Sequence, residues 1–140
     1  MNQKMLSFEE IEALIAAASL KIFGNSLSRE AYHGVDLGQG WLIEINEKYH
    51  SVDYDRNCEV GRKSFETAED LVFYICRSWA FAAGYSKAQR ENIAGRDLRR
   101  TAFAHEAELM GRYSVEWQKR TEQRQTDILE NNPYNDEAYL

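Results

Sequence analysis

The sequence predicts an α+β fold in which an N-terminal helix precedes an antiparallel three- to four-stranded meander and three helices packed on the sheet, in the order αβββααα. Three observations predict this class. Residues 7–24 have amphipathic helical spacing, residues 30–66 have strand-forming residues between glycines, and the remainder has helical segments with capping signals. The 140 residues can bury a sizeable core, so we expect residues 1–140 to form a single α+β domain.

The first helix is predicted to begin at Ser7. Ser7 and Glu10 have the spacing of a capping box, in which each side chain satisfies a backbone N–H of the first turn. Apolar residues then recur at helical spacing along one predicted core face: Ile11, Leu14, Ile15, Ala18 and Ile22. Gly24 is predicted to end the helix.

The meander is predicted from tyrosine, valine, isoleucine and tryptophan between glycines. We expect strands at about residues 31–37, 41–47 and 59–65. Residues 49–57 are either a further strand or a long acidic connection.

Three helices are predicted after the meander. Thr67 followed by Asp70 is a capping signal for a buried helix over residues 71–85, in which Arg77 is the only charged residue. Ser86 is predicted to cap the next helix, which Gly95 interrupts at a cost of about 1 kcal/mol.

The last helix is predicted to run from Ser114 to about Glu130, where Pro133 prevents its continuation. It is mostly polar, so it must bury a narrow seam. Its four apolar residues are Val115, Trp117, Ile128 and Leu129.

The acidic composition limits the classes of partner. A net charge of −6 argues against a general binder of nucleic acid or anionic membrane, because such binders need basic surface. No segment approaches the roughly 20 apolar residues that span a membrane, and no secretion signal is visible. Two cysteines, Cys58 and Cys76, suit reduced thiols in the cytoplasm.

Catalysis has no positive support in the sequence, and we expect no cofactor and no metal. The histidines His33, His50 and His105 have no nucleophile and acid at recognisable spacing. Paired acids such as Glu106 and Glu108 are interpreted as surface charge, because unpaired acids are seldom buried.

The meander contains a candidate surface for a protein partner. Acidic residues there alternate with aromatic residues, a mixture that suits recognition of a basic protein. The equal alternative is a solvated sheet edge whose charges prevent aggregation. The predicted contact residues are Trp41, Glu44, Glu47, Tyr49, Asp53, Tyr54 and Asp55.

A second charged group contains Arg96, Arg99 and Arg100. Acidic residues lie close to them in the sequence, so we favour pairing within the chain. The alternative is a small regulatory or scaffolding module in which these arginines hold an anionic ligand or nucleic acid.

From residue 71 onward the chain resembles the immunity protein 63 family, whose members are encoded beside toxins of bacterial polymorphic and contact-dependent systems. The resemblance includes the hairpin before Thr67, and Glu106 stands where we expect an amide-bearing residue. It is carried by Asp97, Arg99, Arg100, Phe103, Leu109, Trp117, Arg120, Ile128, Leu129 and Pro133.

The resemblance implies a cytosolic immunity protein without catalytic residues, which binds and blocks one toxin domain. The leading hypothesis is therefore stoichiometric inhibition of a cognate toxin, and the acidic charge of the chain suits a basic toxin. The resemblance leaves the toxin's activity and the oligomeric state of this protein open.

Overall fold

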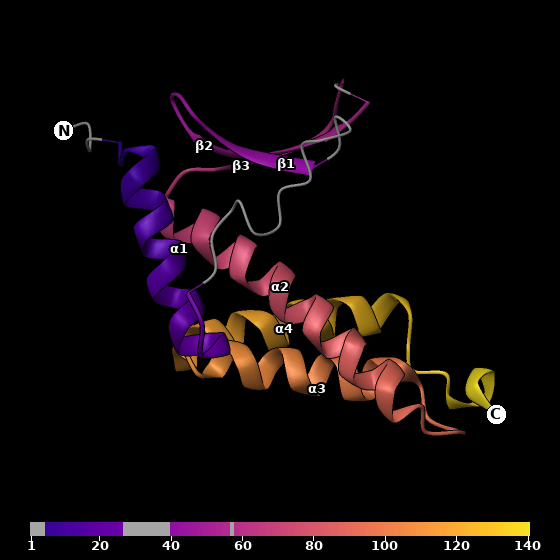
Figure 1. Ribbon diagram of the computed structural model, residues 1–140. Helices are drawn as coiled ribbons and strands as arrows, with labels where there is room; N and C mark the ends of the chain where they lie inside the picture. The colour runs from indigo at the N-terminus through magenta and orange to yellow at the C-terminus, as the bar shows by residue number, and fades with distance from the viewer. Residues whose placement is uncertain (1–4, 27–39, 57) are drawn as a thin grey trace. The chain divides into compact units, whose positions relative to one another are not determined.

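The described part of the chain confirms the predicted α+β class, with one helix, three antiparallel strands and then three helices (Figure 1). The computed structural model describes residues 5–26, 40–56 and 58–140. The elements are α1 (Phe8–Phe23), β1 (Gly40–Ile45), β2 (Tyr49–Asp55), β3 (Cys58–Phe65), α2 (Ala68–Glu91), α3 (Leu98–Gly111), α4 (Val115–Asn131) and the 3-10 helix η2 (Asp136–Tyr139). The strand predicted over residues 31–37 lies outside the described residues.

The ends of α1 confirm the capping prediction. The backbone N–H of Glu10 donates to Ser7 Oγ, and that of Ser7 donates to Glu10 Oε1, each over 3.1 Å. Gly24 ends the helix in the left-handed region at φ 79°, which glycine adopts without steric cost. The burial predicted for Leu14 is wrong, because its side chain is 42% exposed. Leu14 lies at one edge of the predicted stripe, and Ser19, at the other edge, is buried instead.

The sheet has the strand order β1-β2-β3, and both pairs are antiparallel. The segment left open by the sequence therefore contains the central strand. Directly paired residues lie on the same face, so Tyr49 and Phe65 share a face. Tyr49 Oη accepts a hydrogen bond from the Leu6 N–H (2.9 Å), and the rings of Phe65 and Tyr74 lie 5.2 Å apart. The apolar face of the sheet is thus turned toward helical segments.

The boundary between α2 and α3 differs from the prediction. The Asp70 N–H donates to Thr67 Oγ1 (3.1 Å), which confirms the first cap, but α2 continues through Ser86 to Glu91. Ser86 does not start a helix, because the residues on both sides of it continue one. The break occurs where Gly95 adopts φ 75°, and α3 begins only after it.

α4 begins and ends close to the predicted residues. The Trp117 N–H donates to Ser114 Oγ (3.1 Å), and the helix stops just before Pro133. Trp117 is buried as predicted. Val115 is 66% exposed, so its predicted burial is wrong. The polar residues Thr121 and Gln125 fill the buried seam in its place.

The chain divides into two compact units, each with buried apolar residues. Unit 1 comprises Met1–Leu20 and Gly24–Ile75, and unit 2 comprises Lys21–Phe23 and Cys76–Leu140. Ile11, Ile15, Val52 and Leu71 are fully buried in unit 1, and Ile22, Cys76 and Met110 are fully buried in unit 2. The expectation that residues 1–140 form a single domain stays a prediction.

Candidate functional site

Strand pairing brings four of the predicted contact residues to one end of the sheet. Trp41 pairs with Asp53, Gly40 pairs with Tyr54, and Asp55 pairs with Cys58. These positions surround the turn from β2 into β3. We call this region the hairpin end, and it comprises Trp41, Asp53, Tyr54, Asp55, Cys58, Glu59 and Val60.

The other three predicted contact residues lie toward the opposite end of the sheet. Glu47 is exposed in the turn between β1 and β2, whereas Tyr49 is only 4% exposed. Tyr49 therefore belongs to the core of unit 1. β2 has seven residues, so Glu47 and Asp55 are separated by about 25 Å. The seven residues do not form one compact patch.

A β-bulge adds an exposed apolar side chain to the hairpin end. Asp53 pairs with Gly61 and Tyr54 pairs with Glu59, so Val60 is the extra residue of β3. Its side chain is 65% exposed. Bulges re-aim side chains, and this one presents Val60 outward close to half-buried Tyr54. Sequence reasoning missed Val60, although Gly61 was a signal, since glycine inside a strand often marks a bulge.

Arg62 neutralises two acids of the sheet. Its guanidinium donates to both carboxylate oxygens of Glu59 (2.8 and 3.0 Å) and also to Glu44. The hydrogen bond from Arg62 holds the pKa of Glu59 below its ordinary value, and the same contacts raise the pKa of Arg62. Residue spacing does not indicate this pairing, because Arg62 lies 18 residues from Glu44. Glu44 consequently contributes less attraction for a basic partner than its charge alone suggests.

Two of the predicted acidic contact residues can attract a partner with their full charge. Glu47 and Asp53 are exposed, and neither forms an ion pair within the described ranges of the chain. The sequence of unit 1 contains 6 basic and 13 acidic residues, a formal charge of −7, whereas unit 2 contains 11 and 10, a charge of +1. The excess acid of the chain therefore belongs to unit 1, and the acids of the C-terminal segment are balanced by basic residues of unit 2.

His50 has a structural partner on each ring nitrogen. Nδ1 lies 2.7 Å from Ser64 Oγ, and Nε2 lies 2.8 Å from Asn46 Oδ1. Asn46 Oδ1 also accepts from the Lys48 N–H (3.2 Å), so His50 donates from Nε2 and accepts the Ser64 hydroxyl at Nδ1. The side chains come from the β1–β2 turn, β2 and β3. We assign them to the stability of that turn.

The arginine group confirms the interpretation of pairing within the chain. Arg99 donates to Asp97 Oδ2 (2.9 Å) and to the carbonyls of Asn132 (2.7 Å) and Pro133 (2.8 Å). Arg100 forms two hydrogen bonds with the carboxylate of Asp136, of 2.9 and 3.1 Å. These arginines attach the segment after α4 to the start of α3, so they are not free for an anionic ligand.

Asp97 organises this attachment. Its side chain is 1% exposed, caps α3 by accepting from the Arg99 N–H (2.9 Å), and accepts from the Asn135 N–H (2.9 Å). The hydrogen bond from the Arg99 side chain is the main cause that lowers the pKa of Asp97 to about 2. Arg96 has its own partner, since its Nε donates to Thr101 Oγ1 (3.3 Å).

Glu106 corrects the surface interpretation of the paired acids. Its side chain is fully buried and pairs with Arg77, whereas Glu108 is 60% exposed. His105 on the same helix is half-buried, and burial is the main cause that lowers its pKa. Its Nδ1 lies 4.0 Å from Glu108 Oε2.

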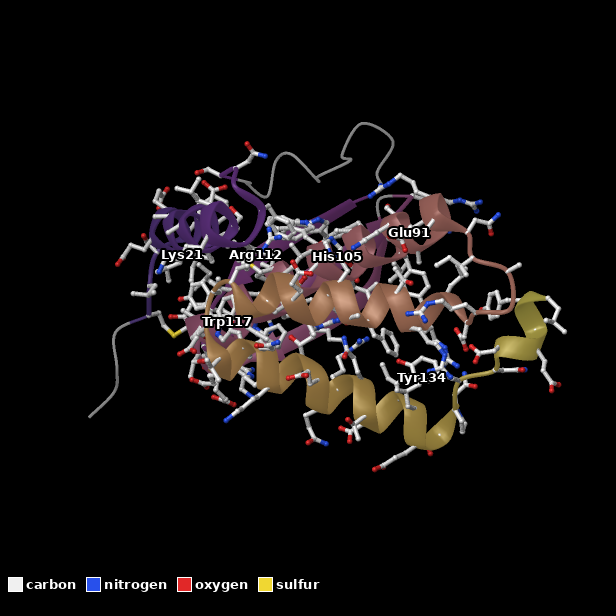
Figure 2. The ribbon with its side chains drawn as sticks, turned by 90° about the horizontal axis from the view of Figure 1, so that it is seen from below. Lys21, Glu91, His105, Arg112, Trp117 and Tyr134 are labelled. Carbon is white, nitrogen blue, oxygen red and sulfur yellow. The ribbon has the colours of Figure 1, made fainter. Side chains whose placement is uncertain are left out.

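An open groove of about 620 Å³ lies between α3 and α4 in unit 2. Figure 2 shows these two helices side by side, with Tyr134 toward one end and Arg112 and Trp117 toward the other. Ala104 and Ala107 are among its lining residues. Its two lining arginines, Arg100 and Arg112, already pair with Asp136 and Glu108. Sequence reasoning did not foresee this groove, because it depends on how two separate helices pack.

The described residues show no group of three or more His, Cys, Asp or Glu side chains that could hold a metal ion. Nor is any helix among them long and apolar enough to cross a membrane.

Comparison with models of protein families matches residues 46–127 to Immunity protein 63, and the chain belongs to this family. The match includes β2, β3, α2, α3 and most of α4. It therefore contains Asp53, Tyr54, Asp55 and Val60 of the hairpin end. Neither the curated proteins nor the solved structures give a match to this chain.

Proposed function

We propose that this protein binds a cognate bacterial toxin domain in a one-to-one complex and thereby keeps the toxin inactive. The observation that carries this proposal is membership of the immunity protein 63 family over residues 46–127. Inhibition by binding requires no catalytic residue and no cofactor. We place the interaction in the cytoplasm, where the toxin would otherwise act on the cell that makes it.

The hairpin end is the surface that we propose for toxin binding. It combines half-buried Trp41 and Tyr54, whose side chains lie on opposite faces of the sheet, with exposed Val60. Aromatic residues are enriched among those that dominate binding energy. Asp53 and Asp55 lie beside them. This mixture of apolar anchors and carboxylates fits a basic toxin surface.

The charge of unit 1 supports a basic partner. A charge of −7 on this part of the chain would attract a basic domain over distances of about a Debye length, roughly 10 Å at 0.1 M salt. Attraction of this kind raises the association rate, whereas anchors such as Trp41 slow dissociation.

Glu47 tests how far the binding surface extends. A standard interface covers about 800 Å² on each partner, which corresponds to a width of about 30 Å. The estimated 25 Å between Glu47 and Asp55 therefore fits within one interface only if the toxin lies along β2. Charge-reversal variants made separately at Glu47 and at Asp55 show whether both ends of the sheet contact the toxin.

The first experiment co-expresses this protein with the product of the neighbouring reading frame. We expect that product to be toxic alone, harmless together with this protein, and co-purified with it in equal amounts. A neighbour that is harmless alone and does not bind would refute the proposed function.

The second experiment reverses charge at the hairpin end. Asp53→Lys combined with Asp55→Lys should slow association by about tenfold and weaken protection. The matched control is Asp127→Lys combined with Glu130→Lys, which makes the same charge change at exposed positions of α4. Equal effects of the two pairs would show that overall charge, and not the hairpin end, governs binding.

A further inference from the structure

The exposed side of α1 carries leucines and alanines between charged residues at its two ends. Ile11, Ile15 and Ile22 are fully buried, yet Leu14 and Leu20 on the other side are 42% and 52% exposed. A helix at the surface of a globular protein ordinarily carries polar residues on its solvent side. The outer side of α1 therefore has the composition of a surface that is covered by something else.

The exposed residues form a seam that suits a second helix. Apart from Glu9, the exposed residues of the helix make up what we call the outer stripe of α1: Glu10, Ala13, Leu14, Ala17, Leu20 and Lys21. Positions 10, 13, 17 and 20 follow the spacing of three and four residues that characterises helix pairs. The small side chains of Ala13 and Ala17 permit close approach, and Leu14 and Leu20 supply projecting apolar groups.

The outer stripe is complementary to itself when turned end for end. In an antiparallel pair centred between residues 15 and 16, Glu10 faces Lys21 of the second copy, and Leu14 faces Ala17. Such a pair is related by a two-fold axis and also aligns the helix dipoles favourably.

Both charged residues are available for this contact. Glu10 uses only Oε1 in the capping box, so Oε2 remains. Lys21 lies over the Tyr113 ring at 5.4 Å and forms no ion pair with the described residues.

We propose that the outer stripe of α1 is the interface between two copies of this chain. The dimer is independent of toxin binding, because the stripe lies on a different element from the hairpin end. α1 has 16 residues and is about 24 Å long, so one helix pair buries less than the roughly 1,200 Å² of a standard interface. The dimer is therefore weak, with a Kd of the order of 100 µM.

Sedimentation velocity of the full chain measures this equilibrium from about 5 µM to about 1 mM, a range that brackets the expected Kd. We expect the average mass to rise from 16.3 kDa toward twice that value. Leu14→Glu should weaken the dimer at least about tenfold, because it replaces two apolar contacts with two carboxylates that lie within one turn of each other across the two-fold axis. Val115→Glu is the control, since Val115 is an apolar residue on another helix and is more exposed than Leu14, at 66% against 42%. This variant should dimerise as the wild type does.

Exchanging the charges of Glu10 and Lys21 tests the interface even if the Leu14→Glu variant does not fold. Glu10→Lys should reduce dimerisation, and adding Lys21→Glu should restore it, because the two residues face one another across the axis. Circular dichroism of each variant checks that its total helix content matches that of the wild type. A wild-type chain that stays monomeric at 1 mM overturns the proposal, and so does a Leu14→Glu variant that dimerises normally. A monomeric wild type whose toxin affinity falls with Leu14→Glu also overturns it, because the stripe then belongs to the toxin interface.

Discussion

Glu106 Oε2 accepts a hydrogen bond from Arg77 Nη1 over 3.2 Å, at a position where the Glu106 side chain has no exposed surface. Its other oxygen accepts from Gln125 Nε2 (2.8 Å), and the same amide donates to the Phe103 carbonyl (2.8 Å). One buried carboxylate thus joins α2, α3 and α4. Charge buried in this way is tolerated only while each partner is present.

Removal of Glu106 should strongly destabilise the protein. Glu106→Ala leaves Arg77 buried without its carboxylate, and we expect the free energy of unfolding to fall by about 3 to 5 kcal/mol in urea titrations. Glu108→Ala, two residues further along α3 at an exposed position, should have little effect. Replacing both partners, as in Arg77→Met with Glu106→Leu, should recover most of the loss. A double variant no more stable than Glu106→Ala would contradict this explanation.

Asp97 should make stability depend on pH in the acid range. Its pKa falls from an ordinary value of 3.8 to about 2 in the folded chain, so the folded state holds its proton less tightly than the unfolded state. The resulting stabilisation is complete above about pH 5 and is lost as pH falls through 4 toward 2. We expect it to be of the order of 2 kcal/mol.

Comparison with Asp97→Asn isolates this contribution. The variant should be less stable than the wild type at pH 7, and the difference should shrink between pH 5 and pH 2. Thermal unfolding of both proteins at several pH values measures this difference in stability. A constant difference across that range would show that the charge of Asp97 is not what stabilises the fold.

Gly84 should not tolerate alanine, although it lies within a helix. A Cβ at this position would lie 2.3 Å from the Ala102 carbonyl oxygen, so α2 and α3 would have to move apart. Alanine is favoured over glycine inside helices by about 1 kcal/mol, yet we expect Gly84→Ala to cost about 1 to 3 kcal/mol. Chemical denaturation shows whether the substitution lowers or raises the free energy of unfolding. A more stable Gly84→Ala variant would show that the two helices separate easily.

Association with the toxin should depend on salt if the acidic charge of unit 1 guides it. We expect the association rate to fall about tenfold between about 0.05 M and about 0.5 M salt, with a smaller change in dissociation. Stopped-flow or surface-based kinetics separate the two rates. An association rate that is insensitive to salt would leave the apolar anchors as the main basis of recognition.

Local signals predicted the ends of several elements correctly. Ser7, Thr67 and Ser114 each cap a helix as their spacing indicated, because a cap depends on residues within one turn. Ser86 carried a similar signal but lies inside α2. A capping residue can start a helix only where the preceding residues leave the helical conformation, and here they do not.

The candidate surface was only partly predictable. Composition indicates Asp53 and Tyr54, but only the register of the strands shows that Asp53 pairs with Trp41 and that Tyr54 pairs with Gly40. Val60 was missed, because a single extra residue in β3 turns it outward. Glu44 was overvalued, because its partner Arg62 lies 18 residues away in the sequence.

The sequence by itself determined the α+β class, the capped helix starts and the acidic balance, since each depends on neighbouring residues or on composition alone. Only the tertiary structure decided which charges are neutralised, which apolar residues stay exposed, and which residues gather at the hairpin end. The reason is that these properties depend on pairs such as Arg77 with Glu106, whose members come from different elements. Their distance is fixed by strand register and helix packing, and neither is visible in the spacing of residues along the chain.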